Sequence, residues 1–127
     1  MTWVSLWGPV ILLKILIFSL SSLPDPGLPP VTGSDKMAHF LVYALLAALW
    51  GRALSAGSPA KVTSLRTLAA MAASALYGGV DELHQRYVPG RVADWHDLLA
   101  DATGAVAGGL FVLLVARAWQ RSRRRLA

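Results

Sequence analysis

Four long apolar stretches occupy most of this chain, and each is bounded by polar or charged residues. Four such segments in a chain of 127 residues leave too little polar surface to cover them in water. Lipid is therefore the expected solvent, and helices are the structures that satisfy their own backbone hydrogen bonds in lipid. The chain is predicted to be an all-α integral membrane protein, a four-helix transmembrane bundle with helices at about 3–22, 35–54, 64–86 and 94–120.

The composition agrees with a single membrane domain over residues 1–127. Only 15% of the residues are charged, whereas a soluble domain carries about 25%. The absence of cysteine excludes disulfides and thiolate metal sites. The first apolar stretch has no basic region before it, contains Lys14 and is followed by no clear cleavage motif. We therefore expect an uncleaved first helix, and Lys14 within it is a functional candidate for which the sequence suggests no partner.

Basic and acidic residues lie on opposite sides of the predicted bundle. The loop between the second and third helices holds Arg52, Lys61 and Arg66, and the C-terminal tail holds five arginines; neither segment contains an acid. The positive-inside rule places both segments, and both termini, in the cytoplasm of a cell whose inner membrane the chain crosses several times. All acidic residues and histidines then lie at the outer face, where any recognition or chemistry is expected. The arginines are interpreted as topology anchors, so no nucleic-acid partner is predicted.

Three predicted helix ends bring polar residues to this outer face. Asp35 and His39 are four residues apart, a spacing at which a carboxylate can orient an imidazole for acid–base catalysis. Glu82 and Gln85 end the third helix, and Arg91 follows on a predicted turn as a forked donor for phosphate or carboxylate. The candidate catalytic residues are His39, Glu82 and Asp97. The candidate binding residues are Asp35, Lys36, Gln85, Arg91, Asp94 and Asp101.

Three carboxylates form one stripe on the fourth predicted helix, at Asp94, Asp97 and Asp101, with Asp94 also the predicted N-cap. Their mutual repulsion calls for a cation, either a metal or the side chains of Lys36 and Arg91. Oxygen ligands favour Mg²⁺, Ca²⁺ or Mn²⁺, and a histidine would allow Zn²⁺. No metal-ligand spacing is specific, so no residue is assigned to a metal and any cofactor is left unknown.

Small residues continue this stripe further along the fourth predicted helix. Gly104 and Gly108 predict a close approach to another helix. We also expect the acyl chain of a lipid ligand to lie beside these glycines.

The ordered set of these motifs resembles the VanZ-like family of small bacterial membrane proteins. The resemblance covers about residues 19–109. It implies four membrane helices and a link to the low-level teicoplanin resistance of the founding member. Asp101 stands where many members carry Asn, which adds a carboxylate to the site. The matching elements are Ser21 to Pro24, Asp35-Lys36, His39-Phe40, Tyr43, Glu82 to Gln85, Val88 to Arg91, Asp94, Asp97, Asp101-Ala102 and Gly104-Ala105.

These observations predict a membrane protein whose outward-facing polar site binds an anionic lipid or lipid-linked envelope intermediate. As an enzyme it would also modify this ligand, and the resemblance connects it with glycopeptide resistance. The alternative is a non-catalytic binding or assembly subunit of the bacterial envelope. A nucleotide reaction is disfavoured because there is no phosphate-binding glycine loop and the site faces away from cytosolic ATP. The sequence leaves open the oligomeric state and the choice between enzyme and binding protein.

Overall fold

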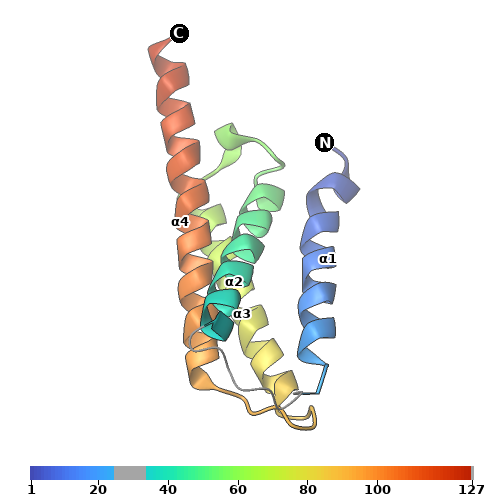
Figure 1. Cartoon of the computed structure of the whole chain (residues 1–127). Helices are drawn as coiled ribbons and strands as arrows, with labels where there is room; N and C mark the ends of the chain where they lie inside the picture. The colour runs from blue at the N-terminus through green and yellow to red at the C-terminus, as the bar shows by residue number, and fades with distance from the viewer. Residues whose placement is uncertain (25–33, 127) are drawn as a thin grey trace.

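The protein is an up-and-down bundle of helices, seen in a computed structural model that describes residues 1–24 and 34–126 (Figure 1). Over these residues the chain contains no strand, which confirms the predicted all-α fold. The fourth helix runs beyond its predicted end at 120 and projects past the bundle. The elements are α1 (Trp3–Ser21), α2 (Ser34–Leu54), the short 3-10 helix η1 (Pro59–Lys61), α3 (Ser64–Gln85) and α4 (Trp95–Arg125).

Three of the helices, α1, α2 and α4, are long and apolar enough to cross a membrane. The helix α3 has 22 residues but is less apolar, because its buried face carries polar side chains that include Thr67, Ser74 and Asp81. Its outer face is apolar, with Leu68 and Leu76 exposed. A helix that is polar inside and apolar outside is the arrangement expected beside lipid, where polar groups must find partners within the bundle.

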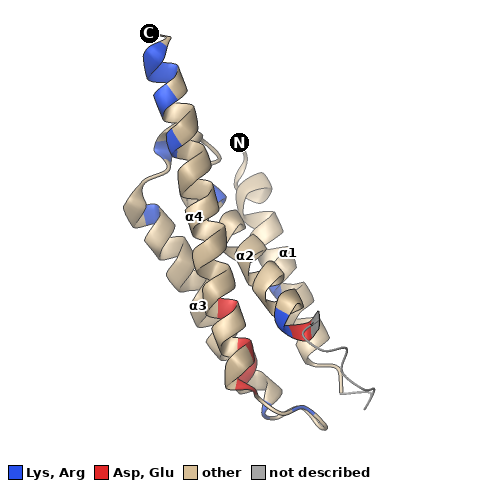
Figure 2. Ribbon diagram, turned by 60° about the vertical axis from the view of Figure 1, so that its left-hand side comes forward, with Lys and Arg blue, Asp and Glu red and all other residues tan. Residues whose placement is uncertain are grey.

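The two ends of the bundle differ in charge, as the sequence predicts. Both termini and the α2–α3 connection lie at one end, and the α3–α4 connection lies at the other (Figure 1). Figure 2 shows the acidic residues of the described chain gathered at the end of the α3–α4 connection, whereas the arginines of α4 lie at the opposite end. Asp25 lies outside the described residues. Polar chemistry in this protein is therefore concentrated at one end of the bundle.

Glycines allow α4 to approach α2 closely. A Cβ atom added to Gly104 would overlap the backbone of Phe40, and one added to Gly108 would overlap the backbone of Ala44. This confirms the predicted close packing. The expectation that an acyl chain lies beside these two glycines is wrong, because α2 already covers them.

The helix α1 packs on the rest of the bundle through an apolar stripe and several polar contacts, one of them at Lys14. Val10 and Ile17 lie in a core cluster with Tyr43 of α2. The ammonium group of Lys14 lies 4.6 Å from the ring centre of Tyr77, whose hydroxyl donates a 2.7 Å hydrogen bond to the carbonyl of Lys14. Lys14 thus has an aromatic partner on α3, which the sequence did not reveal.

Candidate functional site

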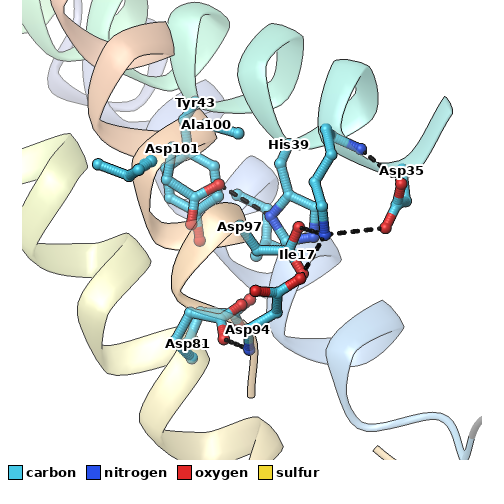
Figure 3. A network of polar contacts seen from close by, with 12 residues as sticks. Ile17, Asp35, His39, Tyr43, Asp81, Asp94, Asp97, Ala100 and Asp101 are labelled. Carbon is cyan, nitrogen blue, oxygen red and sulfur yellow. Dashed lines mark hydrogen bonds and ion pairs between the residues drawn. The ribbon is translucent and has the colours of Figure 1, made fainter. Parts of the chain in front are cut away.

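The ammonium group of Lys36 lies among three carboxylates at the starts of α2 and α4. Figure 3 labels these carboxylates as Asp35, Asp94 and Asp97. Its Nζ atom is 3.2 Å from Asp35 and 2.9 Å from Asp94, and it also contacts Asp97. Asp94 is the N-cap of α4, as predicted, and accepts the backbone N–H of His96. The Lys36 ammonium and this N–H hold the pKa of the Asp94 carboxyl below its usual value. Lys36 is consequently engaged by the protein's own acids, which weakens its predicted role as a donor to an anionic ligand.

His39 pairs with a carboxylate of α4. Its Nδ1 atom lies 2.8 Å from Oδ1 of Asp101, which is fully buried (Figure 3). The predicted pairing of His39 with Asp35 is wrong, because Asp35 is turned toward Lys36. A buried carboxylate beside an imidazole fixes its orientation and tautomer, as required for a general base or a metal ligand.

Glu82 connects the end of α3 to the start of α4. One of its oxygens, Oε2, accepts the backbone N–H of Asp94 at 3.1 Å. The other oxygen, Oε1, is buried without a hydrogen-bond partner among the described residues. Potential ligand atoms of His39, Glu82 and Asp101 all lie within 4.8 Å of one another. These three residues therefore form a compact group at the junction of α2, α3 and α4.

Asp81 forms a second polar centre, between α1 and α3. Its Oδ2 atom accepts hydrogen bonds from Ser21 at 2.8 Å and from Gln85 at 3.2 Å. The sequence offered a signal for Asp81, since an acid too short to reach the headgroups must turn inward. It offered none for Ser21, because only helix packing brings that hydroxyl to Asp81. Neither residue was among the candidate site residues.

Arg91 holds the C-terminal end of α1. Its Nε atom donates to the carbonyl of Leu23 at 3.1 Å, and an Nη2 hydrogen is directed at the carbonyl of Leu20 at 3.4 Å. A guanidinium group carries five N–H donors, so three remain for other partners. Arg91 therefore combines a structural contact with spare donor capacity.

Two adjoining cavities meet at this end of the bundle. The first, about 230 Å³, lies among α1, α2 and α3, and its wall combines apolar with polar side chains. The second, about 380 Å³, is mostly polar. Both cavities are lined by Asp35, His39, Gln85 and Arg91. Of the two, only the second is lined by Lys36, Asp94 and Asp97. Only the first is lined by Ile17, Leu20, Ser21, Val42, Tyr43 and Asp81, among others.

All nine predicted site residues are accounted for by these cavities and their immediate contacts. Seven of them line the second cavity. The remaining two, Glu82 and Asp101, are hydrogen-bonded to the backbone of Asp94 and to His39, respectively. The residues chosen from the sequence thus lie together in space, while their catalytic or binding roles remain predictions.

Comparison with known proteins identifies the family of this chain. The model of the VanZ/LLP1 family matches residues 6–116. No curated protein and no solved structure matches the chain. Because the family match covers most of the chain, the protein belongs to the VanZ/LLP1 family, which confirms the resemblance seen in the motifs. Together with the apolar helices, this membership makes it a membrane protein.

Proposed function

We propose that this VanZ/LLP1 protein is a multi-pass protein of the bacterial inner membrane that binds an anionic amphiphile at its outer end. The ligand class is a phospholipid or a lipid-linked envelope intermediate. The observation that carries the proposal is the pair of adjoining cavities, one partly apolar and one polar. An amphiphile needs this combination, because its chain and its headgroup favour different surroundings. The teicoplanin resistance that the family resemblance implies is compatible with such an envelope ligand and forms part of the proposal.

Arg91 is the residue proposed to hold the headgroup. It lines both cavities, and its remaining N–H groups suit a phosphate, which a guanidinium binds in a forked geometry. The acyl chain would lie along Ile17, Leu20 and Val42, at the contact of α1 with α2. Contacts of α1 with the bundle are fewer than those between α2 and α4, which favours entry of a lipid from the side, next to α1.

Replacement of Arg91 by Ala tests this assignment. The variant should bind polyprenyl phosphate or phosphatidylglycerol more weakly by about 1.5–3 kcal/mol, the range for a lost hydrogen bond to a charged group. This corresponds to about a 10- to 150-fold higher Kd, measured by titrating the full chain in detergent.

The matched control is Arg86→Ala, which removes the same charge from an exposed position near the end of α3. Affinity in this control should stay close to that of the unaltered chain. Equal losses in the two variants would mean that only net charge matters and would contradict a site at Arg91.

Chemical modification of the ligand is a second candidate function, favoured by the pairing of His39 with Asp101 beside Glu82. An imidazole oriented by a buried carboxylate can accept a proton from water or a hydroxyl group. Mass spectrometry of polyprenyl phosphate recovered after incubation would show a product that the His39→Gln variant does not form. Recovery of unchanged lipid from the unaltered chain would favour the non-catalytic binding or assembly subunit.

A further inference from the structure

We propose that His39, Glu82 and Asp101 bind one divalent metal ion, of the Zn²⁺ or Mn²⁺ type. The three side chains come from α2, α3 and α4, and their potential ligand atoms lie within 4.8 Å of one another. This inference goes beyond lipid binding and does not depend on it.

Two buried carboxylate oxygens at this group are without partners among the described residues. Asp101 is 0% exposed and its Oδ2 atom makes no hydrogen bond; Glu82 is 7% exposed and its Oε1 atom makes none. Burying a carboxylate oxygen without a partner is costly, and a bound cation removes that cost. Both unpartnered oxygens belong to the group that has metal-ligand spacing, which is an observation separate from the clustering itself.

The positive charge of Lys36 is already engaged by other carboxylates. Lys36 contacts Asp35, Asp94 and Asp97. In the described part of the chain, no lysine or arginine nitrogen lies within 4.0 Å of Glu82 or Asp101. In the stripe of carboxylates on α4, Asp94 and Asp97 are therefore paired with Lys36, whereas Asp101 belongs to the proposed metal site.

The contact between His39 and Asp101 is slightly shorter than the spacing of two neighbouring metal ligands. Bonds of about 2.1 Å to zinc separate adjacent ligand atoms by roughly 3.0–3.4 Å. At the observed Nδ1–Oδ1 distance of 2.8 Å, a small separation of the two atoms lets an ion take the place of the shared proton, which is then released to solvent. Binding of the ion by both carboxylate oxygens of Asp101 would also give Oδ2 a partner. Glu82 completes the set after a small side-chain movement. Gly78 leaves room for the carboxylate, because a Cβ atom there would lie 2.8 Å from Oδ2 of Asp101.

The ligand set indicates the type of ion and the direction of its open positions. One imidazole and two carboxylates suit Zn²⁺ or Mn²⁺ better than Mg²⁺ or Ca²⁺, which favour oxygen ligands alone. Of the three residues, His39 lines both cavities, so an open coordination position beside His39 would face the space proposed for the headgroup. If the proposed function holds, a phosphate there would bind to the metal as well as to Arg91.

Metal titration of the full chain tests the site without any lipid. The protein is purified in detergent, treated with a chelator and titrated calorimetrically with Zn²⁺ or Mn²⁺ alone. We expect one saturable site per chain, with affinity lowered at least tenfold in His39→Gln and in Asp101→Asn. The matched control is His96→Gln, which removes an exposed histidine that contacts Asp94 outside the group. Its metal affinity should be unchanged.

Three results would overturn the proposal: no saturable binding by the unaltered chain, equal weakening in the two histidine variants, or unchanged affinity in folded His39→Gln. Circular dichroism shows whether each variant is folded. If His39→Gln does not fold, Co²⁺ is added to the unaltered chain instead. It should give visible absorption bands typical of nitrogen and oxygen ligands, and Zn²⁺ should abolish these bands. Absence of the bands would overturn the site. Lipid binding is measured separately, by titration in the presence of a chelator. Failure of the metal proposal and failure of the lipid-binding proposal can therefore be distinguished.

Discussion

Lys36 is the residue whose charge joins the start of α2 to the start of α4. Its ammonium group contacts Asp35 of α2 and both Asp94 and Asp97 of α4. Asp94 and Asp97 are three residues apart on one helix face, so their charges would repel without it. Together these contacts fix the start of α4 against the start of α2, and the three residues Lys36, Asp94 and Asp97 form part of the wall of the second cavity.

Replacement of Lys36 by Met should lower the free energy of unfolding by about 1–2 kcal/mol, since the contacts are partly exposed to solvent. The pH dependence has a definite sign. The pKa of Asp94 is lowered in the folded state, so its ionised carboxylate contributes to the free energy of unfolding above about pH 4. This contribution is lost as the pH falls through the lowered pKa. Thermal unfolding in detergent at several pH values measures both effects.

The control for this prediction is Lys61→Met, which removes an exposed lysine at the other end of the bundle. It should change stability little at any pH. The role assigned to Lys36 would be contradicted if Lys36→Met lost no more stability than Lys61→Met, or if its loss of stability stayed the same in acid.

The sequence was sufficient to select the residues of the candidate site and to suggest Lys36 as a partner of Asp94 and Asp97, but not to find the partner of His39. Spacing along one helix suggested that His39 pairs with Asp35, whereas packing between helices brings it to Asp101. The contact of Ser21 with Asp81 joins residues sixty positions apart. Such pairs depend on helix rotation and register, which a single amphipathic pattern does not specify.

Among the elements, α2 and α4 form the most extensive helix contact, and α4 carries glycines where it meets the backbone of α2. The four α-helices were largely predictable because hydropathy is a local property of the chain, but α4 continues to Arg125 instead of ending near 120, and the short η1 was not predicted. The inward polar face of α3 was harder to recognise as part of a membrane bundle. The mean hydropathy of α3 combines an apolar outer face with a polar inner face. For this reason, hydropathy marks α1, α2 and α4 as candidate membrane spans but does not mark α3.

A change of Gly108 to Ala should destabilise the protein by about 1–3 kcal/mol, because the added methyl group overlaps the backbone of Ala44. The matched control is Gly8→Ala in α1, where the nearest atom to an added Cβ is 3.8 Å away on Val4. That control should be neutral or slightly stabilising, since Ala is the better helix former. Equal thermal stability of the two variants in detergent would contradict the close α2–α4 contact.

At the scale of the whole molecule, charge divides the bundle into a basic end with both termini and an acidic end with the candidate site (Figure 2). A site at the outer end can receive its ligand from the outer leaflet or the envelope. A site at the cytoplasmic end would meet a different set of ligands, including soluble nucleotides. Orientation is therefore the central claim on which the proposed function depends.

Cysteine labelling of intact spheroplasts tests this claim most directly, because the natural chain contains no cysteine. Val92 is exposed on the α3–α4 connection, while Ala60 and Ser122 are exposed near the basic end. A membrane-impermeant thiol reagent should label Val92→Cys in intact spheroplasts, and should label Ala60→Cys and Ser122→Cys only after lysis. Labelling of Ala60→Cys and Ser122→Cys before lysis, with Val92→Cys protected, would place the acidic site in the cytoplasm and contradict the account.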